Sequence, residues 1–466
     1  MSNKNLDLLF GDYKVALRTM MIPMMLGMLI MQSYNLIDGI WISFLGPTAL
    51  AALGVTTPLF IVLNGFANGM AAGGTSLIAR FIGAKNKDKA DQSATQAIIL
   101  AIIISIIISV IVLVFQKPIL SSIGGKSILS IAVQYNTIIF SGAIFVMLMA
   151  MLSGILRAEG DMNRALYIMA LSGVMNAVLD PIFMFKLNMG IQGAAVSTVI
   201  SAIIPCIVLI YWLLIKKDAY VKIKVKFLKL NKKILYVLLM VGIPASMEML
   251  CISIQLGFMN TILSTIINTN AVAAYTAGMR VILFGIVPAV GLKLALVTVE
   301  GASYGGKKFL RIKKVFQYGT KLGILIGLSI GILIFIFAPQ IALLFSYSPQ
   351  TAQLIPQITL MLRVMIIFFL SQPIGSICSG YFQGIGKGPT SLFTAILQEI
   401  IFPISIVLIL VLSFKVNFTI LLIGLVSGKL IGASISWIYS YIHCNKDLKQ
   451  YGSEGELITE NNKLNL

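Results

Sequence analysis

The residues of this chain that are best placed to do chemistry are two aspartates inside long apolar segments. Asp38 lies in the first such segment, and Asp180 lies in a later one, four residues after Asn176. That spacing puts Asn176 and Asp180 on one face of a helix. Pro181 has no N–H, so it leaves the carbonyl oxygen of Ala177 without its usual partner. Carboxylate, amide and carbonyl oxygens suit a hard cation such as Na⁺, and the same two acids suit a proton.

The composition places these acids within a membrane. The chain is 58% hydrophobic and only 11% charged, whereas soluble globular proteins are about 25% charged. Uncharged runs at 97–115, 322–338 and 400–414 approach or reach the roughly 20 residues that span a bilayer as a helix. Because these runs are continuously apolar, they indicate helices and not the alternating strands of a barrel. We therefore predict an all-α integral membrane protein.

Breaks at charged or turn-rich stretches predict twelve transmembrane helices. The first is interpreted as a retained span, because it is too long for a signal peptide and contains Asp38. The predicted ranges are 15–43, 49–78, 94–116, 129–155, 164–186, 190–215, 234–266, 271–300, 317–338, 353–382, 389–413 and 418–442.

Basic residues in the loops predict the orientation. One side of the membrane receives most of them, and the other side receives only Lys117, Lys126, Lys186 and Lys415. The positive-inside rule then places both termini in the cytoplasm of a multi-pass protein of the cell membrane. The net charge of +19 is explained by orientation and by contact with anionic lipid headgroups. Nucleic acid is not an expected partner, because the lysines are divided among short loops.

A lysine-rich connector at 216–233 divides the chain into an N-lobe at 1–215 and a C-lobe at 234–442, followed by a tail at 443–466. Short matches recur in the same order in the two halves: Ile22-Pro23 as Ile243-Pro244, Gly83-Ala84-Lys85 as Gly305-Gly306-Lys307, and Ser153-Gly154 as Ser379-Gly380. Six spans bring the chain back to its starting side, so the repeat is parallel. We expect two six-helix lobes related by a pseudo-two-fold axis along the membrane normal, an arrangement found in secondary transporters.

The predicted topology puts the polar side chains at one depth. Asp38 and Asp180 each lie about six residues, roughly 9 Å, from the outer ends of their spans, and Thr198 lies about eight residues, roughly 12 Å, from its own. Asp38, Asn176, Asp180 and Thr198 are therefore predicted to converge as a cation-binding and coupling site. A structural hydrogen bond at a kink is the alternative explanation for each aspartate.

The second half carries buried charges of both signs. The acids are Glu248 and Glu399. Arg280, Arg363, Lys293 and Lys429 are expected in ion pairs, because unpaired cations would repel a cationic substrate. Glu248 is the expected exception and would meet such a substrate. Methionines in the first span suit adaptable apolar contacts. The full set of candidates for a substrate cavity is Gln32, Tyr34, Asn35, Glu248, Asn260 and Gln383.

An ordered set of motifs over nearly the whole chain resembles the multidrug and toxic compound extrusion family. The matching stretches are Tyr34 to Asp38, Phe44 to Gly46, Ala49 to Gly54, Ile155 to Asp161, Asn176 to Pro181 and Phe382 to Lys387. The resemblance implies an antiporter that exports organic cations and drugs in exchange for Na⁺ or H⁺. It also implies a cation site at the four residues named above and a bend of the first helix at Pro23. Glu248 departs from the family pattern by about one helical turn.

These observations predict alternating access, with Pro23 and Pro181 as hinges, no cofactor beyond the coupling ion, and a monomer. A flippase for lipids or lipid-linked oligosaccharides is the main alternative, kept open by Arg280, Lys293 and Arg363. A passive channel and a membrane-embedded enzyme are the others. Against an enzyme, the one histidine, His443, follows the last span, and the chain has no HExxH or Asp-rich diphosphate motif.

Overall fold

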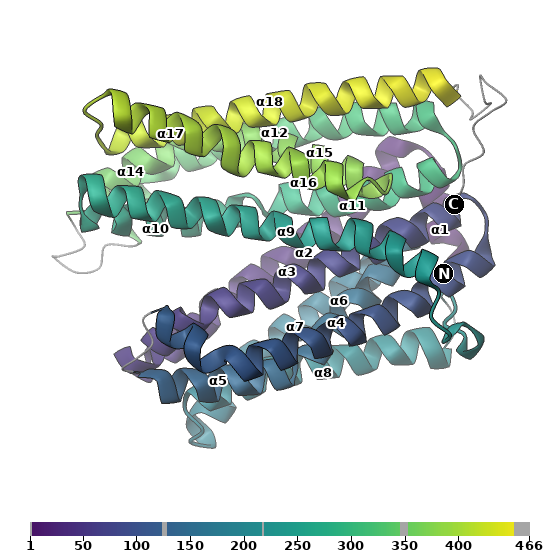
Figure 1. Ribbon diagram of the computed structural model, residues 1–466, viewed down its shortest axis with the longest axis horizontal. Helices are drawn as coiled ribbons and strands as arrows, with labels where there is room; N and C mark the ends of the chain where they lie inside the picture. The colour runs from purple at the N-terminus through teal and green to yellow at the C-terminus, as the bar shows by residue number, and fades with distance from the viewer. Residues whose placement is uncertain (1, 124–127, 217–218, 345–352, 452–466) are drawn as a thin grey trace. The chain divides into compact units, whose positions relative to one another are not determined.

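The structure is a computed structural model that describes residues 2–123, 128–216, 219–344 and 353–451. Every regular element in these residues is helical (Figure 1). The described chain divides into two compact units, Met1–Met249 and Leu250–Leu466.

The first unit is a bundle of long helices. Its densest packing joins α2 to α7 and α3 to α6. The elements are α1 (Ser2–Phe10), α2 (Tyr13–Ser43), α3 (Pro47–Gly83), α4 (Lys87–Ser122), α5 (Leu129–Ser141), α6 (Ala143–Ala158), α7 (Met162–Pro181), η2 (Ile182–Lys186), α8 (Ile191–Ile210), η3 (Tyr211–Lys216), η4 (Val225–Phe227) and the first part of α9 (Lys232–Ile262).

The second unit repeats this plan around its own apolar core. Here α15 packs closely against α11, α12 and α18. The elements are the end of α9, η5 (Leu263–Ile267), α10 (Thr269–Gly285), α11 (Val287–Gly305), α12 (Phe309–Leu343), α14 (Ile355–Val364), α15 (Ile366–Gly384), α16 (Gly388–Ile396), η6 (Leu397–Ile401), α17 (Phe402–Ser413) and α18 (Phe418–Tyr451).

The predicted all-α class and the predicted number of spans are confirmed. Within the described residues, nine helices are long and apolar enough to cross a membrane, and three bent pairs bring the number to twelve. The bends are 43° between α5 and α6, 42° between α10 and α11, and 45° between α14 and α15. The sequence predicted each of these pairs as one uninterrupted span. The last helix also extends to Tyr451, past the predicted end at 442.

The division between the units falls within α9 and not at the lysine-rich connector. The first half of α9 packs tightly on α3 through small residues: a side chain added at Gly69 would stand 2.1 Å from the Ser246 hydroxyl oxygen, and one at Gly73 would stand 2.7 Å from the Leu238 carbonyl oxygen. The backbones of α3 and α9 therefore approach closely. This contact assigns the start of α9 to the first unit.

The lysine-rich connector is fixed to α4 of the same unit. Asp91, which is fully buried, accepts the Lys222 N–H at 2.8 Å and forms an ion pair with the Lys224 ammonium at 2.7 Å. Gln96, also fully buried, accepts the Asn231 N–H at 3.0 Å and donates to the Lys229 carbonyl at 2.9 Å. These contacts hold the backbone of the connector at Lys222, Lys229 and Asn231.

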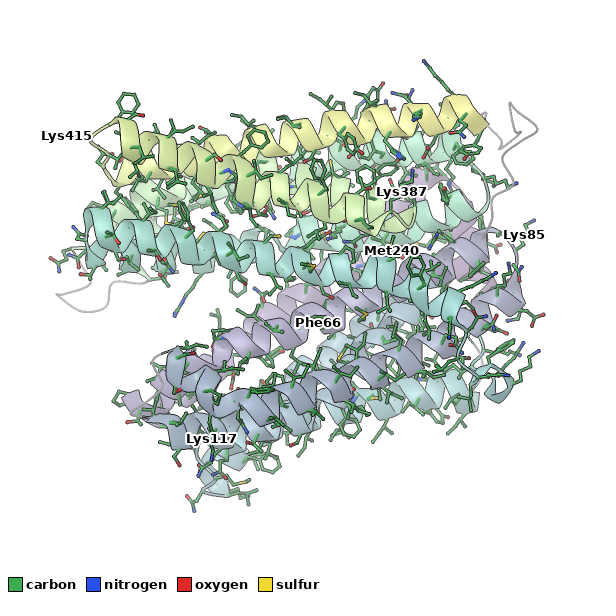
Figure 2. All side chains as sticks on the ribbon, in the orientation of Figure 1. Phe66, Lys85, Lys117, Met240, Lys387 and Lys415 are labelled. Carbon is green, nitrogen blue, oxygen red and sulfur yellow. The ribbon has the colours of Figure 1, made fainter. Side chains whose placement is uncertain are left out.

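Lysines mark the ends of each unit when it is viewed by itself. In the first unit, Lys85 and Lys117 lie towards opposite ends of the bundle (Figure 2). In the second unit, Lys387 and Lys415 also lie towards opposite ends (Figure 2). The end that carries Lys85 or Lys387 is called the lysine-rich end below.

Candidate functional site

The candidate site lies where α2, α7 and α8 of the first unit meet. On α7, Gly173, Asn176 and Asp180 share one face, and on α2, Ile30 and Tyr34 precede Asp38 at steps of four residues. A Cβ atom added at Gly173 would lie 3.0 Å from Ile30 Cγ2 and 3.2 Å from Tyr34 Cδ1. The glycine therefore allows the helix that carries Asp38 to approach the helix that carries Asp180.

Asp180 is fully buried and is held from α8. Its Oδ1 accepts a short hydrogen bond from the Ser197 hydroxyl and a longer one, 3.4 Å, from the Asn176 amide. The same amide lies 3.4 Å from the Thr198 hydroxyl oxygen, and Thr198 in turn donates to the Ala194 carbonyl at 2.9 Å. Asn176, Asp180 and Thr198, which the sequence predicted as one group, thus come together through hydrogen bonds.

Asp38 completes the cluster from α2. Its carboxyl group interacts directly with that of Asp180. Three oxygens around this contact, Asp38 Oδ1, Asp180 Oδ2 and Asn176 Oδ1, are buried without a hydrogen-bond partner among the described residues. A buried polar atom left unpaired costs about 1–3 kcal/mol. These oxygens are therefore ready to accept a proton or to bind a metal cation.

The ligand set favours a light, hard cation or a proton. Among the described residues, the polar groups that interact with the acid pair belong to asparagine, serine and tyrosine side chains, whereas transition metals prefer imidazole and thiolate. In the described part of the chain, no group of three or more His, Cys, Asp and Glu side chains is arranged to hold a metal ion. The site thus differs from a catalytic or structural zinc centre.

The short connection between α7 and α8 aligns the two helices. After Pro181, the chain forms the π-helical turn η2 and then starts α8 at Ile191. A side chain at Gly193 would stand 2.6 Å from the Phe183 backbone carbon, so only glycine allows α8 to pack this closely on η2. This packing places Ser197 and Thr198 next to Asp180.

Two residues near the acids were not singled out in the sequence. Ser197 is the direct donor to Asp180, and Tyr135 of α5, which is buried, lies within electrostatic range of both acids, as does Tyr34. The adjacent hydroxyls of Ser197 and Thr198 were a usable signal. No signal in the sequence marked Tyr135, because only tertiary packing brings α5 to the site.

The candidates for a substrate cavity are scattered. Gln32 is half-buried on α2, the side chain of Asn35 lies outside the described residues, and Glu248 is buried on α9. In the second unit, Asn260 has a buried carbonyl oxygen without a hydrogen-bond partner among the described residues. Gln383 is buried and donates to the hydroxyl oxygens of Ser379 and Ser391 at 3.1 and 3.3 Å. Tyr34 lies within electrostatic range of both acids.

The expected ion pairs of the second unit form in part. Lys429 and Glu399, both buried, are in direct contact. Arg280 and Arg363 were expected to be buried, and this was wrong, since both side chains are exposed. The Arg363 guanidinium lies 5.6 Å from the centre of the Phe335 ring. A span position that appears central in the sequence is thus not necessarily buried in the bundle.

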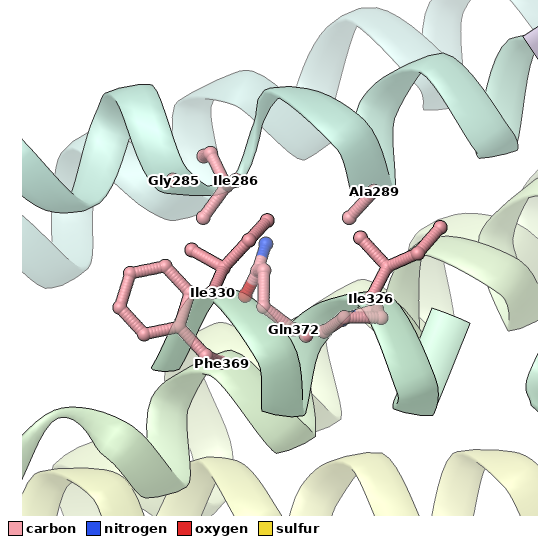
Figure 3. Close-up of a pocket in the computed structure, with 9 residues that line it drawn as sticks. Gly285, Ile286, Ala289, Ile326, Ile330, Phe369 and Gln372 are labelled. Atoms are coloured by element: carbon pink, nitrogen blue, oxygen red, sulfur yellow. The ribbon is translucent and has the colours of Figure 1, made fainter. Parts of the chain in front are cut away.

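A narrow crevice in the second unit lies beside the bend between α10 and α11. Gly285, Ile286 and Ala289 face Ile326, Ile330 and Phe369 across it, and Gln372 contributes a polar amide (Figure 3). Its cavity volume is about 10 Å³, close to the minimum for one water molecule. In this conformation the crevice is too small for an organic substrate, for which pockets of about 300–1,000 Å³ are typical.

The fold and the acid cluster can now be compared with known proteins. The family model described as MatE matches residues 23–182 and 244–411. The chain belongs to the MatE family. The two matched stretches fall in the two halves of the chain, as the internal repeat predicts, and the resemblance drawn from the motifs is confirmed.

Two proteins with similar sequences come from Bacillus subtilis and Staphylococcus saprophyticus. The chain is 30% identical over 319 residues to the probable multidrug resistance protein YoeA of Bacillus subtilis, a match that covers 66% of this chain and 68% of YoeA. It is 27% identical over 385 residues to the multidrug export protein MepA of Staphylococcus saprophyticus, with 82% of this chain and 83% of MepA covered.

Solved MATE structures share the whole fold. A MATE crystal structure in complex with MaL6 has a TM-score of 0.93 and 35% identity, and the match covers 96% of this chain and 99% of that one. A MOP superfamily transporter from Pyrococcus furiosus has a TM-score of 0.92 and 35% identity, with 95% and 98% covered. This MatE chain therefore has the architecture of a membrane transporter.

Proposed function

We propose that this MatE chain is a multidrug exporter of the cell membrane, driven by exchange for Na⁺ or H⁺ at the acid cluster of α2, α7 and α8. The observation that carries the proposal is the pair Asp38 and Asp180, with three buried oxygens that lack partners in the described residues. The names of its relatives, multidrug resistance and multidrug export proteins, support drugs and organic cations as the cargo.

The geometry explains how a cation would be held. A proton shared between the two carboxyl groups satisfies two of the three unpaired oxygens, Asp38 Oδ1 and Asp180 Oδ2. A Na⁺ ion is able to contact those two and Asn176 Oδ1 as well, with Thr198 nearby. Either ion removes the repulsion between two neighbouring carboxylates. Binding therefore brings α2 and α7 together more firmly.

Coupling follows from the position of Asp38 on a long helix with a proline inside. Pro23 interrupts the hydrogen-bond ladder of α2 fifteen residues before Asp38. When the cation binds or leaves, the contact between α2 and α7 changes, and Pro23 is the point at which α2 is able to bend. We infer that this bending alters the cavity of the first unit and so releases the drug, while drug binding from the cytoplasm discharges the ion.

The orientation belongs to the same proposal. With the lysine-rich ends in the cytoplasm, both termini are cytoplasmic, and the acid cluster lies in the outer half of its bundle. The chain is proposed to work as a monomer, because the cluster is complete within one unit of one chain.

The proposal is tested in proteoliposomes by efflux of a fluorescent organic cation, driven separately by a Na⁺ gradient and by a pH gradient. Wild type is expected to respond to one gradient, and Asp38→Asn is expected to lose at least about 100-fold of that response, because one of the two carboxylates is gone. Asp7→Asn, at an exposed position, is the matched control and is expected to behave as wild type.

Two outcomes would contradict the proposal. Uphill transport by Asp38→Asn at the wild-type rate would remove the acid cluster from the mechanism. Failure of folded wild type to respond to either gradient, together with movement of a lipid-linked substrate, would favour the flippase instead.

A further inference from the structure

The second unit holds a buried acid that the acid cluster does not explain. Glu300 lies on α11, about one turn before the helix ends at Gly305. Its side chain is 0% exposed, and both carboxyl oxygens are buried without a hydrogen-bond partner among the described residues. Ordinary structural acids, such as Asp91 in the first unit, are buried against backbone donors and a lysine. Glu300 has neither.

Among the described residues of its unit, no basic side chain forms a hydrogen bond with Glu300. On α15, a side chain at Gly384 would stand 3.2 Å from Glu300 Cβ, and Cys378 and Tyr381 lie within electrostatic range of the carboxyl group. On α18, Cys444 lies within the same range. Lys313 lies within electrostatic range of Cys444, and Lys387 and Lys446 lie within that of His443. Lys293, two turns before Glu300 on α11, packs against Gly380 of α15.

An ionised carboxylate in such a place is very unfavourable. Burying a charge without a counter-ion or hydrogen-bond donors costs far more than burying a neutral carboxylic acid, so a group of this kind takes up a proton instead. The need for a proton is stronger at Glu300 than at the pair Asp38 and Asp180. There, Ser197 and Asn176 donate hydrogen bonds to Asp180. Glu300 is therefore a carboxylic acid in this conformation.

A hydrogen-bonded chain leads from this region towards the lysine-rich end. The Tyr381 hydroxyl lies 3.0 Å from His443 Nδ1, and His443 Nε2 lies 2.6 Å from the Lys387 ammonium. An ammonium has only donors, so Nε2 accepts and the imidazole is neutral with its proton on Nδ1. The Asp447 carboxylate lies 3.4 Å from Nδ1, and the His443 side chain is 16% exposed.

We propose that Glu300 is a proton-binding site of the second unit, loaded from the lysine-rich end through Tyr381, His443 and Asp447. The Tyr381 hydroxyl makes no hydrogen bond to Glu300 in this conformation, so loading requires a movement of α11 against α15 that brings the two groups together. Glu300 then gains the Tyr381 hydroxyl proton, Tyr381 regains one from His443 Nδ1, and His443 regains one through Asp447 from water. One proton enters and no electron moves. Release requires solvent or a cation to reach the carboxyl group, which happens only if α11 separates from α15 and α18. The proton would thus lock this packing.

The direct test is infrared spectroscopy of the full chain in lipid, which detects the C=O stretch of a protonated carboxylic acid. We expect a band at neutral pH that is lost in Glu300→Gln and retained in Asp38→Asn. Retention of every such band in Glu300→Gln would overturn the proposal. Because Asp38→Asn is measured in parallel, the result is independent of whether the acid cluster drives transport.

The path has its own test, which does not depend on how Glu300→Gln folds. Tyr381→Phe keeps the ring and removes the hydroxyl, so it is expected to keep the band and to slow its exchange in heavy water by about tenfold or more. Ser434→Ala, on the exposed face of α18, is the control and is expected to exchange as wild type. Absence of the band in folded Tyr381→Phe and wild type, or equal exchange rates in both, would contradict the proposal.

Discussion

The two halves of this chain share a backbone pattern but differ in the charge that they carry at matching positions. Pro403 follows Pro181 by 222 residues, Gln398 follows Asn176 by the same number, and the same step from Asp180 leads to Phe402. From Asp38 it leads to Asn260. The first half thus keeps two acids without a base, while the second half carries uncharged residues at the matching places.

The second half neutralises the acid that it does place nearby. Glu399 is in contact with Lys429 of α18, and the neighbouring Gln398 uses its amide on the Ser371 carbonyl at 3.4 Å and on Gln372 at 3.3 Å. An acid with a permanent lysine partner has no need of a mobile cation. The duplicated fold thus determines the positions of the polar groups. Whether an acid at one of these positions is able to bind an ion depends on its partner.

Removal of the Lys429 side chain is expected to have the largest effect on stability. Lys429→Ala leaves Glu399 buried without its counter-ion, and loss of one partner of a buried ion pair costs about 3–5 kcal/mol. We expect a strongly lowered thermal unfolding temperature in nanodiscs. The double variant Lys429→Met with Glu399→Leu is the control and should recover most of the stability. If Lys429→Ala unfolds as wild type does, the pair contributes nothing to stability.

Another buried acid of the first half, Glu159, makes the stability of the protein depend on pH. Glu159, in the loop between α6 and α7, is 3% exposed and accepts the Val221 N–H at 3.1 Å. Burial raises its pKa from 4.5 to about 7. The folded state therefore holds the proton more tightly than the unfolded state, so its contribution to stability is full below pH 4.5 and is lost as the pH rises to about 7.

Glu159→Gln keeps the acceptor for Val221 and cannot ionise. Between pH 5 and pH 8, wild type is therefore expected to lose stability relative to this variant by on the order of 3 kcal/mol, since one pKa unit corresponds to about 1.4 kcal/mol. Chemical unfolding of both proteins at the two pH values measures this difference. Parallel stability profiles would show that Glu159 is not held neutral by burial.

Asn176 separates the two candidate ions of the first half. Its Oδ1 is needed as the third oxygen for Na⁺ but not for a proton shared between Asp38 and Asp180. If the ion is Na⁺, Asn176→Ala should weaken binding by about 10- to 100-fold, in line with a lost ligand of about 1.4–3 kcal/mol. Calorimetric titration with Na⁺ measures the change, and Asn64→Ala is a control on α3. An unchanged Na⁺ affinity would leave the proton as the coupling ion.

Lys224 provides the smallest expected effect. Its ammonium contacts Asp91 and Asp88, and these hydrogen bonds raise its pKa. Asp88 is exposed, and Asp91 keeps the Lys222 N–H and the Lys87 ammonium, which lies 3.5 Å away. Lys224→Ala is therefore expected to change stability by about 1 kcal/mol or less. High salt should remove most of the difference in unfolding temperature between variant and wild type. A large effect that persists in high salt would assign the connector a structural role that its backbone contacts do not explain.

Much of this protein is determined by its sequence alone. The uncharged runs predict helical spans because only helices and closed barrels satisfy a backbone in lipid, and barrel strands alternate in polarity. The ordered matches between the halves predict the repeat. Asp38 and Asp180 stand out for a local reason too, since a charge in an apolar span is costly wherever the helix packs. These inferences depend only on residues close together in the chain.

The tertiary structure determines which residues far apart in the chain become partners. Only packing makes Ser197 the donor to Asp180 and pairs Glu399 with Lys429. Only packing leaves Arg280 and Arg363 exposed while burying Glu300, which no sequence pattern marked. The bends near Gly142, Ile286 and Met365 were hidden for the same reason. The cost or benefit of each polar group is set by the side chains that surround it, and those come from other helices.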